Sequence, residues 1–121
     1  MKTSTKISIA RILSKLLIFF LKKKHVIKRD NLIWNLDLNE AVDLSIFLTG
    51  KFEPQIVQTI KKISKGKKYD YLDIGANCGA HSLHLAKEFP NSRVLAIEPT
   101  NYAFAKLVNN INLNENLKNI I

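Results

Sequence analysis

The sequence lacks the features of a secreted or membrane-spanning protein. Its single cysteine, Cys78, excludes a disulfide bond within the chain and makes a reducing compartment, the cytoplasm, the simplest setting. The apolar run 7–21 would rise about 22 Å as a helix, against a hydrocarbon core of roughly 30 Å, and it contains Arg11 and Lys15. A secretory signal is disfavoured because three lysines follow this run and no small-residue cleavage site does.

Acidic residues are scarce, 10 against 19 basic ones, which gives a net charge of +9. The excess of basic residues is distributed unevenly along the chain. Residues 1–30 hold nine lysines and arginines and one acid, Asp30, whereas residues 31–121 hold ten basic residues and nine acids. The basic character therefore belongs to the amino-terminal leader, and we predict no nucleic-acid partner.

The leader, residues 1–30, is predicted to be a basic amphipathic helix, because its apolar residues from Ile9 to Leu21 recur at helical spacing. Two interpretations of it remain. In the slightly favoured one, the apolar face packs on the domain. In the other, residues 7–29 contact anionic lipid, each basic residue adding about 1 kcal/mol near the surface, and the protein lies at the inner membrane surface.

Residues 31–66 are predicted to form an extension made of a short strand and two helices. The strand covers residues 32–38, where Trp34 is expected to serve packing. The first helix covers residues 40–49 and stops at Gly50, and the second begins at Pro54. We expect the second helix to bury one apolar stripe: Ile56, Val57, Ile60 and Ile63.

The centre of the sequence predicts a strand, a tight turn and a helix. An apolar run over residues 69–74 leads into Gly75 and Gly79, four apart, and a helical pattern starts near His81. In a parallel sheet such a turn lies at the carboxyl end of the strand, where ligands bind, and glycine lets a ligand approach the backbone. The turn is therefore a candidate binding loop.

The loop lacks the motifs that hold phosphates. Asn77 occupies a position where a dinucleotide loop needs glycine, and no Gly-Lys-Ser/Thr sequence follows. A second apolar run, residues 93–97, ends at Glu98, whose carboxylate can accept hydrogen bonds from both hydroxyls of a ribose. Together these features favour a nucleoside ligand without a phosphate.

The helices that follow the two strands show no metal site. In the first, Leu83, Ala86 and Phe89 are expected to face inward, and His81 and His84 share a face without a third ligand. Cys78 has no identifiable partner base and is expected only to line the loop. The second helix covers residues 101–112 and exits at an asparagine cluster. Its expected buried residues are Ala103, Leu107, Val108 and Ile111.

These residues resemble a known family. Residues 73–79 (Asp-Ile-Gly-Ala-Asn-Cys-Gly) and 97–99 (Ile-Glu-Pro), with supporting similarity over residues 34–38, 50–54 and 109–119, are similar to the FkbM-type S-adenosylmethionine-dependent methyltransferases. The resemblance covers roughly residues 31–121. It implies a Rossmann-like α/β fold and O-methyl transfer to a sugar, glycan or natural-product hydroxyl. The implied cofactor-binding residues are Asp73, Gly75, Ala76, Asn77, Gly79 and Glu98.

The resemblance also implies an incomplete fold. The family's sheet has seven strands, whereas residues 67–121 supply strands one and two with their helices and, at residues 119–121, the start of strand three. We therefore expect the front portion of an enzyme, with an unpaired edge on strand one. No general base can be named, so the catalytic residues are unknown, and we expect no methyltransferase activity from this chain alone.

Two other functions compete with this interpretation. A truncated remnant could act as a non-catalytic interaction module. A nicotinamide-dependent oxidoreductase would share the strand, the turn, the helix and the acid after strand two, but the spacing of Gly75 and Gly79 argues against it.

Overall fold

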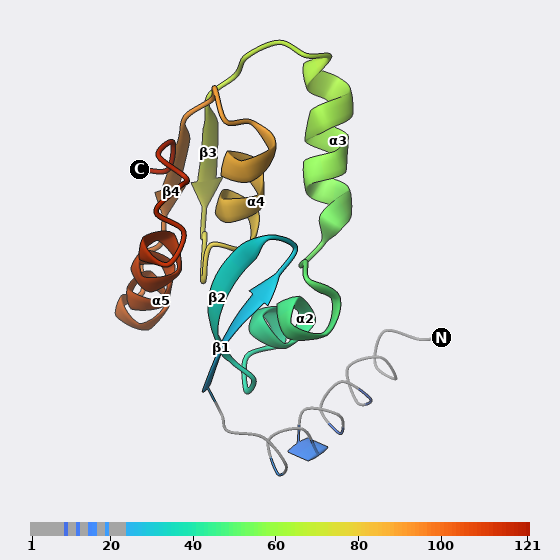
Figure 1. Ribbon diagram of the computed structural model, residues 1–121, viewed down its shortest axis with the longest axis vertical. Helices are drawn as coiled ribbons and strands as arrows, with labels where there is room; N and C mark the ends of the chain where they lie inside the picture. The colour runs from blue at the N-terminus through green and yellow to red at the C-terminus, as the bar shows by residue number, and fades with distance from the viewer. Residues whose placement is uncertain (1–8, 10–11, 13–14, 17–18, 20–23) are drawn as a thin grey trace.

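The computed structural model describes residues 9, 12, 15, 16, 19 and 24–121 (Figure 1). It is an α/β structure, as the sequence predicts. Its described elements follow in the order β1 (Lys24–Arg29), β2 (Leu32–Asp37), α2 (Ala41–Thr49), α3 (Pro54–Ser64), β3 (Tyr71–Ile74), α4 (Ala80–Glu88), β4 (Val94–Ile97) and α5 (Asn101–Asn112).

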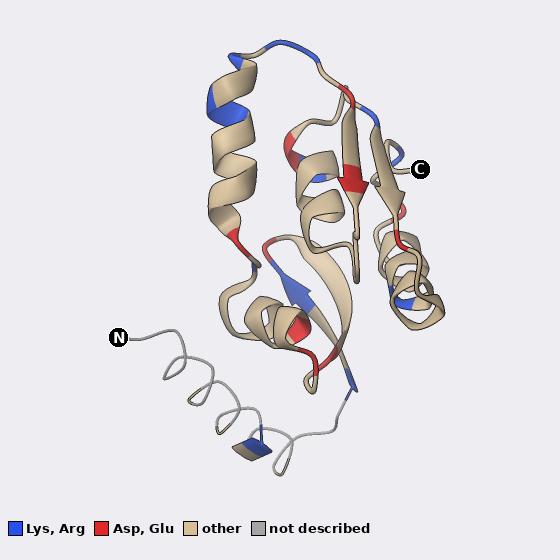
Figure 2. Ribbon diagram, turned by 180° about the vertical axis from the view of Figure 1, so that it is seen from behind, with Lys and Arg blue, Asp and Glu red and all other residues tan. Residues whose placement is uncertain are grey.

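The predicted parallel sheet is confirmed. β3 and β4 pair in parallel, with Tyr71 opposite Val94 and Ile74 opposite Ile97. The predicted start of a third strand is also present, because Ile120 forms a parallel bridge to Val94. Both arrows point toward the β1–β2 hairpin and α5 (Figure 2), so the carboxyl ends of the two strands meet there.

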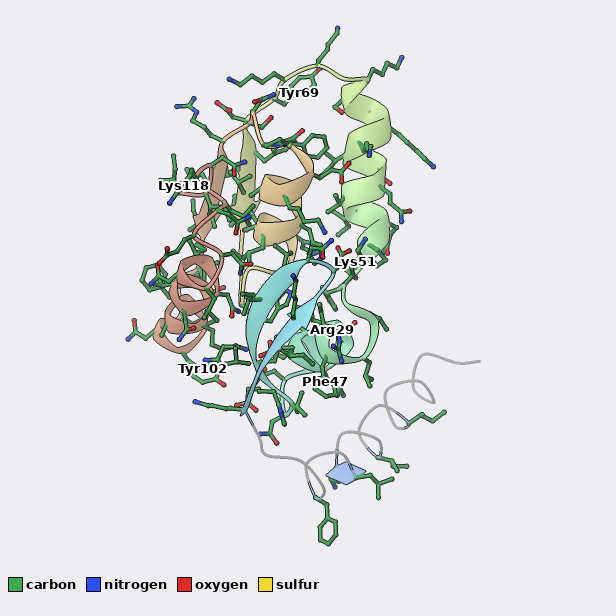
Figure 3. All side chains as sticks on the ribbon, viewed as in Figure 1. Arg29, Phe47, Lys51, Tyr69, Tyr102 and Lys118 are labelled. Atoms are coloured by element: carbon green, nitrogen blue, oxygen red, sulfur yellow. The ribbon has the colours of Figure 1, made fainter. Side chains whose placement is uncertain are left out.

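Strand β1 corrects the predicted extent of the leader helix. Lys24–Arg29 pair antiparallel with β2, through a turn in which Asp30 and Asn31 have φ of 48° and 60°, values typical of a two-residue hairpin turn. Exposed and half-buried residues alternate along β1, a period of two that fits a strand. Arg29 donates from Nε to the Phe47 carbonyl at 2.9 Å and lies over its ring (Figure 3).

Most of the predicted leader helix and its membrane contact lie outside the described residues. Ile9, Ile12 and Leu16 are helical and expose 42%, 59% and 52% of their surface. Within the part of the chain that the structure describes, no helix has the length and apolarity to cross a membrane.

The predicted helices are confirmed, but two predicted buried faces are partly wrong. Gly50 ends α2 with φ 84°, and Pro54 stands in the first turn of α3. On α3, Val57 and Ile60 pack against the core, whereas Ile56 and Ile63 are 37% and 70% exposed. α3 lies outside α4 (Figure 1), so only one side of it has a neighbour to pack on. Val108 on α5 is likewise 38% exposed, while Ala103 and Leu107 are buried as predicted.

The core joins the hairpin to the candidate loop. The buried side chains of one cluster come from β2, α2, the loop and α4, and they are Leu32, Trp34, Leu36, Ile46, Cys78, Ala80 and Leu83. Trp34 has no exposed surface, which confirms its packing role. Tyr102 at the start of α5 donates to Asp37 Oδ2 at 2.9 Å, which ties α5 to the end of β2 (Figure 3). The amino-terminal extension is therefore part of what holds the loop in place.

One face of the parallel sheet is open to solvent among the described residues. Every second side chain of β3 and β4 points away from α4, and these side chains are exposed: Leu72 by 57%, Ile74 by 74%, Leu95 by 44% and Ile97 by 43%. β3 also pairs only with β4 in this part of the chain, as expected for an unpaired strand edge. Parallel sheets are normally covered on both faces.

Candidate functional site

In the candidate loop, residues 75–79, every second residue has a left-handed backbone conformation, and the loop bends over the end of β4. Gly75, Asn77 and Gly79 have φ of 81°, 49° and 88°. Glycine adopts this conformation freely, and asparagine does so more readily than most residues. The N–H groups of Gly75 and Ala76 both donate to the Ile97 carbonyl, at 2.8 and 3.0 Å. These bonds bring the loop against the residue that follows β4, Glu98.

Glu98 contacts the loop directly. Its Oε2 accepts the Asn77 N–H at 3.0 Å, and its Oε1 accepts the Thr100 N–H at 2.9 Å and the Thr100 hydroxyl at 2.6 Å. The Thr100 bonds hold the pKa of Glu98 below its ordinary value, because hydrogen bonds to a carboxylate favour its charged form. Glu98 is therefore an ionised acceptor at neutral pH, and Oε2 retains a lone pair for a further donor.

Asp73 belongs to the same end of the sheet but has a structural partner. Its Oδ2 accepts the hydroxyl of Ser82, a fully buried residue of α4, at 2.5 Å. This bond fixes the carboxylate between β3 and α4. Its other oxygen has no partner among the described hydrogen bonds.

The two glycines of the loop have different surroundings. A Cβ on Gly75 would meet nothing within 4 Å, so the space over this residue is open. A Cβ on Gly79 would lie 2.4 Å from Leu83 Cδ1 and 3.0 Å from Leu107 Cδ1. Gly75 therefore leaves room for a ligand to approach the backbone, whereas Gly79 lets the loop pack closely against Leu83 of α4 and Leu107 of α5. Ala76 is buried at 4% exposure and faces the protein.

Cys78 lines the interior of the loop, as predicted. It has no exposed surface, and burial raises the pKa of its thiol to about 12. Asp43, which is also fully buried, raises it further. Such a thiol carries almost no thiolate at neutral pH, and thiolate is the reactive form.

We expect native Cys78 to resist alkylation by iodoacetamide at pH 8, because its thiol is buried and protonated. The alkylation rate, followed by mass spectrometry, should be at least about a hundredfold lower in the native chain than in the urea-unfolded chain. Equal rates in the two states would show that the loop opens freely.

His81 and His84 are held by different neighbours. His84 is buried and stacks on Trp34 with ring centroids 5.6 Å apart, and its Nδ1 lies 2.7 Å from the Ala80 carbonyl. Burial lowers its pKa, against the Ala80 hydrogen bond and the Asp30 charge. His81 Nε2 lies 3.8 Å from Glu53. Within the described residues, no three potential metal ligands gather.

Three residues that support the site were not identified from the sequence: Ser82, Thr100 and Asn110. Ser82 and Thr100 bond Asp73 and Glu98. Asn110 of α5 donates from Nδ2 to the Cys78 carbonyl at 2.9 Å. The sequence did contain a signal for Asn110. It continues the helical spacing of the buried residues Ala103 and Leu107, and a polar residue on a buried helix face needs a hydrogen-bond partner.

The comparisons with known proteins bear on the fold of the chain and on the class of protein that it resembles. No family model matches the chain. The chain is 31% identical over 93 residues to the methyltransferase sdnD of Sordaria araneosa, an alignment that covers 69% of this chain and 35% of that protein. The chain thus spans about a third of the length of the curated relative it matches.

Solved structures are similar as well. TYW2 of P. horikoshii, in complex with MeSAdo, matches with a TM-score of 0.55 and 26% identity, over 83% of this chain and 35% of that one. TYW2 of M. jannaschii, in complex with AdoMet, matches with a TM-score of 0.57 and 22% identity, over 84% of this chain and 42% of that one. The fold is therefore that of the Rossmann-like methyltransferases in part, and the matches support a relationship to the S-adenosylmethionine-dependent enzymes.

Proposed function

We propose that this chain carries the cofactor-binding part of an S-adenosylmethionine-dependent O-methyltransferase of the FkbM type. The observation that carries the proposal is the pairing of Asn77 with Glu98 at the carboxyl ends of β3 and β4, beside the open space over Gly75. The sequence similarity to a methyltransferase, and the solved neighbours that hold AdoMet and MeSAdo, support the same cofactor.

The residues of the loop fit such a cofactor. Glu98, ionised and with one acceptor site left on Oε2, would accept a hydrogen bond from a ribose hydroxyl. The backbone at Gly75, Ala76 and Asn77 would lie along the cofactor, and Asp73 would reach its methionine end directly or through water. Gly79 would act through the helix it precedes, whose first N–H groups favour a carboxylate.

The acceptor in this proposal is a hydroxyl of a sugar, glycan or natural product. When bound, S-adenosylmethionine supplies an electrophilic methyl group on a sulfonium. Transfer requires the acceptor oxygen in line behind that group, usually with a general base. The chain's own contribution is to bind and orient the cofactor, and none of the loop residues described above would serve as the base.

Titration calorimetry of the 121-residue chain with S-adenosylhomocysteine tests the proposal. We expect binding, and we expect Glu98→Ala to weaken it by about tenfold or more, because a hydrogen bond to a charged group, which contributes about 1.5–3 kcal/mol, is lost. Glu115→Ala is the matched control, since Glu115 is an exposed acid outside the loop, and its affinity should equal that of the wild type.

Two results would contradict the assignment. Absence of binding by the wild-type chain would remove the cofactor, and equal affinities of Glu98→Ala and wild type would remove the role of Glu98. A parallel titration with NADH addresses the oxidoreductase alternative. Binding of NADH without binding of S-adenosylhomocysteine would favour that enzyme class.

A further inference from the structure

Asn110 reaches from α5 into the candidate loop. Its side chain has no exposed surface. Nδ2 donates to the Cys78 carbonyl at 2.9 Å, and Oδ1 accepts the Asn35 N–H from β2 at 2.7 Å. The two polar ends of one amide therefore join three segments that lie 32 and 75 residues apart in the sequence.

The chemistry at this position requires an amide. The loop offers a carbonyl, which needs a donor, and β2 offers an N–H, which needs an acceptor. An asparagine side chain supplies both at once, whereas an aspartate cannot donate and a leucine can do neither. A buried carbonyl or N–H left without a partner is strongly unfavourable.

The peptide group that Asn110 contacts is held from both ends. The Cys78 carbonyl accepts from Asn110, and the N–H of the same peptide group, on Gly79, donates to the Ala76 carbonyl at 2.8 Å. Because a peptide group is planar, two such bonds fix its orientation. This group lies between Asn77, which contacts Glu98, and the start of α4.

We propose that Asn110 is a positioning residue for the cofactor loop. It holds the peptide group between Cys78 and Gly79, and so keeps the Asn77 N–H on Glu98 and the first turn of α4 directed at the ligand. This inference rests on the proposed function for the identity of the ligand. The effect on the loop itself can be measured without any ligand.

Asn114 provides a matched control. It is also buried, lies one turn beyond Asn110, and bonds the backbone of the same strand, with Ile33 N–H donating to its Oδ1 at 2.9 Å and its Nδ2 donating to the Ile33 carbonyl at 2.7 Å. It also donates to the Asn110 carbonyl at 2.8 Å. None of its described hydrogen bonds reaches the loop.

The experiment compares Asn110→Asp with Asn114→Asp in the full chain, by amide hydrogen exchange and by titration with S-adenosylhomocysteine. Each variant keeps the acceptor for β2 and loses the donor. We expect exchange of the amides at residues 77–80 to rise at least about tenfold more in Asn110→Asp, and its affinity to fall at least about tenfold, against less than about threefold for Asn114→Asp. The pair Asn110→Ala and Asn114→Ala repeats the test without a buried charge.

Equal exchange of the loop amides in the two variants would overturn the proposal, because Asn110 would then be only one more buried residue. A wild-type chain that does not bind S-adenosylhomocysteine would refute the proposed function, while the exchange rates would still decide the role of Asn110. The wild type gives a test independent of variant folding. The side-chain amide protons of Asn110 should exchange at least about tenfold slower than those of its exposed neighbour Asn109, and equal rates would also overturn the proposal.

Discussion

Gly79→Ala is expected to lower the free energy of unfolding by about 2 to 5 kcal/mol. A left-handed conformation costs an alanine roughly 1–2 kcal/mol, and φ at this residue is 88°. The new methyl would also lie 2.4 Å from Leu83 and 3.0 Å from Leu107, and overpacking a core typically costs about 1–3 kcal/mol. Urea unfolding followed by circular dichroism measures the sum.

Gly66→Ala separates the two contributions. Gly66 has φ 78°, and a Cβ there meets nothing within 4 Å, so only the conformational cost of about 1–2 kcal/mol is expected. Gly75→Ala, at φ 81° and also in open space, should lose similar stability and in addition bind S-adenosylhomocysteine less tightly. If Gly79→Ala and Gly66→Ala were equally stable, the close packing of the loop against Leu83 and Leu107 would not matter to folding.

The sequence could predict the segment from β3 to β4, because the signals for its strands, turn and helix lie close together in the chain. Gly75 and Gly79 mark the turn, the apolar runs on either side have the lengths of strands, and Glu98 follows the second run. These signals agree with one another within about thirty residues. The strand, the loop, the helix and the second parallel strand were accordingly predicted within one or two residues of their observed bounds.

Strand β1 was missed because its residues carry no local strand signal. Residues 24–29 are rich in lysine and arginine, which suggested a basic leader, and their apolar and charged residues do not alternate. The alternation arises from the pairing with β2, which brings His25, Ile27 and Arg29 onto the inner side while Lys24, Val26 and Lys28 stay exposed. Pairing is a property of two segments and cannot be inferred from the composition of one.

The supporting residues of the site were missed for a similar reason. Asn110 resembles a helix-exit asparagine, and only the positions of Cys78 and Asn35 give it a role. The exposed residues Ile63 and Val108 show the converse, because helical periodicity marks an apolar face without saying how much of it a neighbour covers. The role of a polar residue and the burial of an apolar one thus depend on contacts between distant segments, which helical periodicity does not give.

Lys106→Met is expected to lower the free energy of unfolding by about 3–5 kcal/mol. Lys106 Nζ lies 2.7 Å from Asp43 Oδ2, and Asp43 has no exposed surface. The carboxylate also accepts the Asp37 N–H at 2.7 Å, so it joins α2, β2 and α5. Removing the lysine leaves a buried charge without its counter-ion, which is far more costly than losing a surface pair.

A second substitution distinguishes this explanation from a loss of packing. Asp43→Asn combined with Lys106→Met removes both charges and keeps an acceptor for the Asp37 N–H, so the double variant should recover most of the stability, to within about 1–2 kcal/mol of the wild type. The exposed pair of Lys61 and Glu88 is the control, and Lys61→Met should cost less than about 1 kcal/mol. A double variant no more stable than Lys106→Met would mean that the aliphatic chain of the lysine, and not its charge, supports the junction of α5 with the hairpin.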